Sequence, residues 1–212
     1  PHLDDLQCAY GCLEGFLAAK NSHSVPVLAV FDNEETGSLT KQGADSTFLD
    51  EVLKRISLAS GKDEEGHYRA VSSSFMVSAD NAHALHPNHP EKADPINRPM
   101  INKGIVIKFN AAQHYTTDAV SCAVYRDLCE SNDIPVQVFT NRSDSRGGST
   151  LGNLSNAHVS LNTVDIGLAQ LAMHSCYETV GARDTKHLVD AMTIFYSKTF
   201  RVDAGGSFEL LD

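Results

Sequence analysis

The 212-residue sequence predicts an α/β domain: a three-layer α/β/α sandwich with a mixed, largely parallel central sheet. Two observations predict this class. Short apolar runs without alternation, such as 25–31, are typical of strands covered on both faces. These runs alternate along the chain with segments of helical periodicity, as in α/β proteins. A hydrophobic content of 42% is enough for one ordinary core, so we expect residues 1–212 to form one domain.

Helical spacing of apolar residues predicts four helices. The first begins at about residue 5, with Asp4 and Asp5 at the cap positions. The second covers 46–59, and Gly61 is placed to end it. Two further helices are expected over 117–130 and 184–200.

Five strands are expected between these helices, over 25–31, 70–77, 104–109, 135–139 and 159–165. Prolines at 87, 90, 95 and 99 predict an irregular loop before the strand at 104. We expect Asp165-Ile166-Gly167 to form a turn that ends the last strand.

Composition narrows the class of partner. The net charge of −10 argues against a nucleic acid or an anionic membrane surface, since both require clustered Lys and Arg. Small molecules or peptides are the expected partners. The five cysteines are an odd number without a C-x-x-C pair, which favours free thiols and a cytoplasmic location. No apolar run in the sequence has the length of a membrane span.

Acidic residues gather where predicted strands end. Glu34 and Glu35 follow the first strand and Asp80 follows the second, while Asp4 precedes the first helix and His174 lies beyond the last strand. Functional groups collect at the carboxyl ends of strands in α/β sheets. Carboxylates with one imidazole suit Zn²⁺, Mn²⁺ or Co²⁺, and two such ions need a bridging carboxylate.

Each of these residues also has a purely structural interpretation, which spacing alone favours. Asp4 fits a helix cap, Glu34-Glu35 a solvated turn and Asp80 a strand-end turn. His174 fits a partly buried histidine with its own hydrogen-bond partners. At this level the metal site is a hypothesis.

Six motifs occur in an order that resembles the aspartyl aminopeptidases and their bacterial relatives. The resemblance extends from Leu3 to about Phe200. The motifs are Leu3-Asp4-Asp5-Leu6, Phe31-Asp32-Asn33-Glu34-Glu35-Thr36-Gly37-Ser38, Ser78-Ala79-Asp80-Asn81-Ala82-His83, Gly104-Ile105-Val106-Ile107-Lys108, Gly148-Ser149-Thr150-Leu151-Gly152 and Ala172-Met173-His174-Ser175.

The resemblance implies a phosphorylase/hydrolase-like fold and a metallo-aminopeptidase that uses two divalent ions, zinc first, with Co or Mn as alternatives. By position, Asp4 would bridge the ions, and Glu35, Asp80 and His174 would be terminal ligands. Glu34 would be the general base that takes a proton from the attacking water.

Two further positions match residues that face the substrate in this family, His83 and Lys108. A cation there would favour an N-terminal Asp or Glu. A surface lysine and a loop cluster of His83, His86 and His89 are the structural alternatives, and Pro87 and Pro90 argue against a separate histidine zinc site. His114, Gly147 and Asn153 depart from the family pattern, the last two toward a bacterial type, so hydrolysis of neutral residues stays open.

The family also has an upstream histidine ligand and an inserted dimerisation domain. We therefore expect residues 1–212 to be the C-terminal catalytic part of a protein that forms a large homo-oligomeric shell. We expect the chain alone to bind at most one ion tightly. Two alternatives remain: an inactive fragment that serves as a fold or assembly module, and another di-zinc hydrolase of related fold, such as a deacylase or carboxypeptidase.

Overall fold

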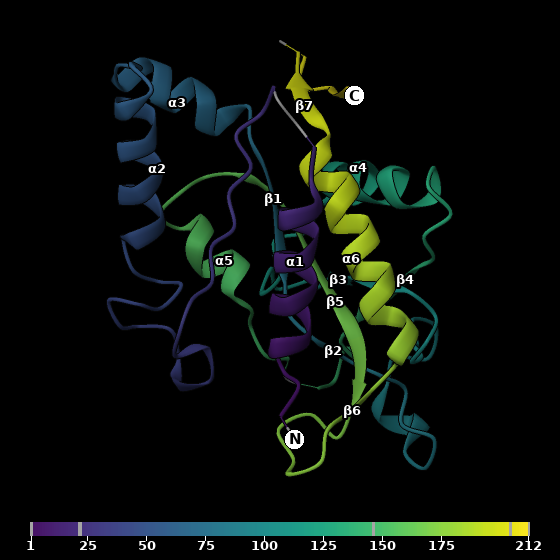
Figure 1. The fold of residues 1–212 in the computed structure, drawn as a ribbon. Coiled ribbons are helices and arrows are strands. Elements are labelled where there is room, and N and C mark those ends of the chain that lie inside the picture. The colour runs from purple at the N-terminus through teal and green to yellow at the C-terminus, as the bar shows by residue number, and fades with distance from the viewer. Residues whose placement is uncertain (1, 21–22, 146, 204, 212) are drawn as a thin grey trace.

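The computed structural model describes residues 2–20, 23–145, 147–203 and 205–211 and has one main sheet (Figure 1). Its strands lie in the order β1-β5-β3-β4, and the short β2 and β6 pair with β5. The bounds are β1 Phe75–Ala79, β2 Ala82–His83, β3 Ile105–Phe109, β4 Val136–Thr140, β5 Asn162–Leu171 and β6 Thr179–Val180. A separate hairpin pairs β7 (Thr199–Val202) with β8 (Phe208–Leu211).

The main sheet is mixed and largely parallel. β1 and β2 run parallel to β5, and β3 runs parallel to β4. The antiparallel pairings are β3 with β5 and β5 with β6. The predicted fold class is therefore confirmed.

Helices cover both faces of this sheet. On one face, α1 (Leu6–Ala18), α4 (Ala119–Glu130) and α6 (Ala182–Ser197) share a core with β3 and β5. On the other face α5 (Leu151–Asn156) lies so close that a Cβ on Gly152 would sit 2.8 Å from Asp165 Oδ1. Because alternate residues of a strand point to opposite faces, Ile166 enters the first core while Asp165 turns toward α5.

The prediction of a strand over 25–31 is wrong. This segment is extended but pairs with no strand in the described part of the chain, and Val25 and Val30 are 72% and 66% exposed. An apolar cavity of about 570 Å³ lies between this segment and β1. Among the described residues, β1 pairs with β5 alone. An apolar run indicates that a segment favours burial. To form a strand, the segment must also lie within hydrogen-bonding distance of another strand.

Three other boundaries differ from the sequence prediction. Residues 70–72 belong to α3 (Glu64–Ser72), because Asp63 caps this helix by accepting a hydrogen bond from Gly66 N at 2.8 Å. β5 continues through 165–167, where a turn was expected. Gly167 is needed there for close approach, since a Cβ would lie 2.0 Å from Asp80 O. α6 ends at Ser197, and 199–202 form β7.

The remaining elements are η1 (Glu34–Thr36), α2 (Phe48–Ala59) and η2 (Pro90–Lys92). All five cysteines are free thiols, as expected, and Cys8, Cys12 and Cys129 are buried. Among the described residues, every helix is too short or too polar to cross a membrane.

Candidate metal centre

The seven residues singled out in the sequence come together around one cavity. Its volume is about 620 Å³. They reach it from the start of α1, from η1, from the ends of β1 and β5, and from β2 and β3. The residues are Asp4, Glu34, Glu35, Asp80, His83, Lys108 and His174.

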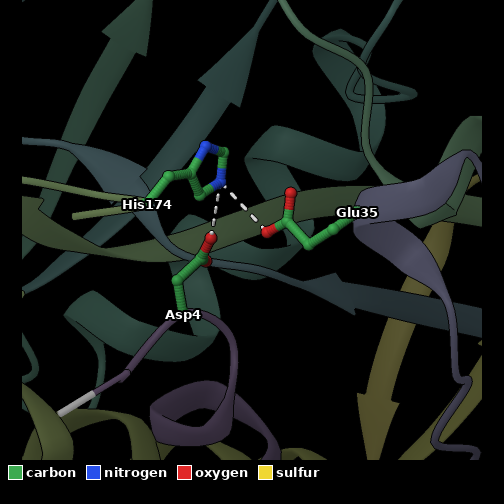
Figure 2. A group of neighbouring side chains, drawn as sticks. All are labelled: Asp4, Glu35 and His174. Atoms are coloured by element: carbon green, nitrogen blue, oxygen red, sulfur yellow. Dashed lines mark hydrogen bonds and ion pairs between the residues drawn. The ribbon is translucent and has the colours of Figure 1, made fainter. Parts of the chain in front are cut away.

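Three side chains form the first group of possible metal ligands, as Figure 2 shows. His174 Nε2 lies 3.1 Å from Asp4 Oδ2 and 3.0 Å from Glu35 Oε1. The Asp4 side chain is 5% exposed, whereas Glu35 and His174 are more than half exposed. One oxygen or nitrogen from each lies within 4.8 Å of the others. The group is therefore compact enough for one ion and open to solvent on one side.

A second group shares Asp4 and adds Asp5 and Asp80. Lys108 Nζ already lies 3.1 Å from Asp80 Oδ2. Sequence reasoning treated Asp5 as a helix cap, but its side chain makes no capping hydrogen bond to α1. The adjacent pair of aspartates was the signal that could have included Asp5 in the site.

Unbalanced negative charge shapes this centre. Burial, together with the neighbouring Asp80 and Glu35 carboxylates, raises the pKa of Asp4 to about 7. Burial and the same Asp80 charge raise the pKa of Glu34 to about 7. Asp4 Oδ1 and Asp5 Oδ1 are buried, and neither has a hydrogen-bond partner in the described chain. Buried carboxylate oxygens without donors are destabilising, and a cation would remove both problems.

Lys108 is 2% exposed, so the surface-lysine alternative is wrong. Burial would lower its pKa, but the charge of Asp80, with smaller contributions from Tyr115 and Asp165, raises it. Its ammonium group also lies 5.5 Å from the centre of the Tyr115 ring. The cavity thus contains a fixed positive charge beside its carboxylates.

His83, His86 and His89 form no metal-binding group among the described residues. The rings of His86 and His89 are 5.1 Å apart, and His89 Nδ1 lies 3.3 Å from Glu91. His83 lies in β2, and all three histidines line the cavity.

Sequence reasoning missed the residues that hold the loops of the site. Asn81 accepts a hydrogen bond from Cys8 Sγ at 2.9 Å and donates one to Gln170, joining α1, β1 and β5. Asp165 accepts hydrogen bonds from Thr116 and from Thr150 Oγ1. Single buried polar residues of this kind have no spacing pattern.

The known proteins of similar sequence belong to one family of aminopeptidases. Residues 1–196 match the family model described as "Aminopeptidase I zinc metalloprotease (M18)". A Clostridium acetobutylicum protein named "Probable M18 family aminopeptidase 2" is 51% identical over 195 residues, which are 92% of this chain and 45% of that protein. A protein of the same name from Ectopseudomonas mendocina is 42% identical over 195 residues, 92% of this chain and 44% of that one.

Solved structures agree. The cryo-EM structure of the Ape4 and Nbr1 complex matches with a TM-score of 0.88 and 37% identity over 93% of this chain and 38% of that one. The S. cerevisiae mApe1 dodecamer matches with a TM-score of 0.79 and 29% identity over 92% of this chain and 44% of that one. The chain spans less than half the length of each of these four proteins.

Proposed function

Because the chain belongs to the M18 family of aminopeptidase I zinc metalloproteases, we propose that its cavity is the metal-binding part of an aminopeptidase active site. The reaction is hydrolysis of the N-terminal residue of a peptide, with acidic residues preferred over neutral ones. One observation carries the proposal. Asp4, Glu35 and His174 are far apart in sequence, yet they present ligand atoms within 4.8 Å of one another.

Asp4, Glu35 and His174 would hold the first ion, and Asp4 with Asp80 would hold the second. Asp4 belongs to both acidic groups, which suits a bridging role. The unpartnered, buried Asp4 Oδ1 supports the fit, and a set of carboxylates and one imidazole suits zinc. When bound, zinc supplies a Lewis acid that polarises the peptide carbonyl and acidifies water. Lys108 on Asp80 competes for the second position, so we infer that the first group binds more tightly.

Glu34 acts as the general base in this proposal. Its place beside Glu35 in η1 brings it to the cavity without using it as a ligand. Burial is the main cause that raises the pKa of Glu34 above its ordinary value, and a raised pKa suits a group that must both accept and release a proton near neutral pH. Glu34 takes the proton of the attacking water and passes it to the leaving amine.

Lys108 and His83 set the substrate preference. A carboxylate side chain that enters the cavity loses its hydration and needs a charged partner. The buried ammonium group of Lys108 provides a positive charge that is held in place by Asp80 and Tyr115. This charge supports the preference for N-terminal Asp or Glu.

We also propose that the whole protein is a cytoplasmic homo-oligomer. The free thiols support a reducing compartment, and the structurally similar S. cerevisiae mApe1 is a dodecamer. Peptides are the expected substrates.

Hydrolysis of aspartyl, glutamyl and leucyl p-nitroanilides by the full-length protein tests the proposal, with Zn²⁺, Co²⁺ or Mn²⁺ supplied in turn. We expect the two acidic substrates to react fastest. Lys108→Met should reduce that preference while leucyl hydrolysis continues. If none of the three substrates is hydrolysed with any ion, the chain acts as an assembly module or as a different hydrolase.

A further inference from the structure

Glu178 joins two segments that are about 170 residues apart. It lies between β5 and β6 and is 4% exposed. Its Oε2 accepts hydrogen bonds from the backbone N–H of Leu3 and, at 2.9 Å, of Asp4. Its Oε1 accepts a hydrogen bond from the backbone N–H of His174 at 2.7 Å. One carboxylate therefore contacts the backbone of two residues of the proposed metal group.

The hydrogen bonds to Glu178 are stronger than those between neutral groups. The backbone N–H groups of Leu3, Asp4 and His174 all donate to this one carboxylate, which favours its ionised form. The carboxylate is thus ionised at neutral pH, and its hydrogen bonds are charge-assisted.

The loop that carries His174 needs such support. Ala172 and His174 both have left-handed backbone conformations, with φ of 56° and 66°. Side chains larger than glycine adopt this region only when the surrounding structure holds them there. The bond from His174 N–H to Glu178 holds the second of these residues directly.

We propose that Glu178 is a positioning residue that sets Asp4 and His174 at metal-binding distance before any ion arrives. It contacts neither the ion nor the substrate, and it acts through the backbone of the two ligands. Glu35 comes from a different segment and is not held by Glu178. This inference rests on the metal site proposed above.

The test compares two acid-to-amide substitutions. In Glu178→Gln one of the two acceptor oxygens becomes an NH₂ group, which cannot accept a hydrogen bond from a backbone N–H. The side chain therefore loses its hydrogen bonds to one of the two segments. In the matched control, Asp184→Asn, the residue replaced is also fully buried and accepts from backbone N–H groups, those of Asn102 and Gly104, but lies away from the cavity. Both variants should unfold at lower temperature. Zinc affinity should fall about 10- to 100-fold in Glu178→Gln alone, as for other residues that orient metal ligands.

Zinc dissociation constants, measured by competition with a chelating dye, decide the outcome. If the wild-type chain binds zinc and Glu178→Gln binds it equally well, Glu178 has no positioning role although the metal site stands. If the wild-type chain binds no zinc, the metal site itself is refuted, and this inference with it.

Amide hydrogen exchange of the metal-free wild-type protein gives a second test, which does not depend on the folding of a variant. The N–H groups of Leu3, Asp4 and His174 should be protected without zinc. If they exchange freely until zinc is added, then the ion and not Glu178 brings the ligands together.

Discussion

Two regions of the molecule supply the proposed metal site, and they are built differently. The first is the sheet with α1, α4 and α6, where residues 163–170 of β5 are all buried. The second is the arm, residues 23–73, which contains η1, α2 and α3. In its two α-helices only Leu49 and His67 are buried among the described residues. Figure 1 shows α2 and α3 standing apart from the sheet.

The arm carries Glu34 and Glu35, and several polar contacts within the described chain tie it to the rest, one of them from Asn162 Nδ2 to Ser72 O. Asp45 Oδ1 lies 2.9 Å from His158 Nε2, Ala44 O accepts a hydrogen bond from Ser155 Oγ, and Glu35 contacts His174. The apolar cavity lies between the arm and β1. Because few residues of the arm helices are buried in the described chain, we expect the arm side of the site to open locally more easily than the sheet side. Metal binding should couple the two.

The largest expected difference is in stability. Ile166→Ala removes a fully buried side chain from the centre of the sheet and should lower the free energy of unfolding by about 2–5 kcal/mol. Leu53→Ala in α2, whose side chain borders the apolar cavity, should lower it by less than about 1.5 kcal/mol because fewer contacts are lost. Urea unfolding measures both. Equal losses would show that the arm is packed as tightly as the sheet.

Substitution of Glu34 and of Glu35 should have different effects, one on the rate of hydrolysis and the other on zinc binding. Glu34→Gln should leave metal content unchanged and reduce kcat by about 10²-fold or more, because it removes a proton acceptor and not a ligand. Glu35→Gln should weaken zinc retention during dialysis. Metal analysis and kinetics of the full-length variants check this. Equal loss of zinc from both would mean that the roles are assigned wrongly.

Zinc should order the arm more than the sheet. We expect amide exchange around η1 to slow by about 10-fold when zinc is added, because an ion held by Asp4 and His174 recruits Glu35. Exchange in β5 should hardly change. Glu35→Gln serves as the control, since zinc should then leave exchange in the arm unaltered. Uniform slowing across both regions would contradict the proposed difference.

Much of the sheet region could be predicted from sequence, because its signals are local. The runs at 104–109 and 135–139 became β3 and β4 within a residue, since each is a short apolar segment bounded by breakers. The convergence of the proposed ligands and base follows from the resemblance of the motifs to one family; these residues are Asp4, Glu34, Glu35, Asp80 and His174. The prediction of a strand over 25–31 was wrong because strand pairing depends on another strand within hydrogen-bonding distance. Glu178 could not be found, since its partners are backbone N–H groups of residues 3, 4 and 174, which leave no side-chain pattern.

The smallest expected effect is on the pH dependence of stability, and it follows from the acids at the junction of the two regions. Asp4 and Glu34 have pKa values of about 7 in the folded chain and near 4 when unfolded. Between about pH 4 and pH 7 the folded state therefore binds more protons than the unfolded state, so the stability of the metal-free protein falls as the pH rises. His174 acts in the same direction, because Glu35 and Asp4 outweigh its burial and raise its pKa, and its stabilising charge is lost as the pH rises.

Glu178 does not change the stability between pH 4.5 and pH 7.5. Its pKa is lowered to about 2 in the folded chain, so its contribution to stability is complete above the ordinary pKa of glutamate and is lost only at lower pH. We expect the midpoint of thermal unfolding of the metal-free protein to fall between pH 4.5 and pH 7.5 through these groups. The fall should be smaller in Asp4→Asn, which removes the most buried acid of the three-residue group. Saturating zinc should reverse the trend in the wild type, because an ion requires the ionised carboxylates and binds more tightly as the pH rises. Scanning calorimetry of both proteins, with and without zinc, measures this. A midpoint that rises with pH in the metal-free wild type, and equally in Asp4→Asn, would show that the acids at the junction do not set the pH response.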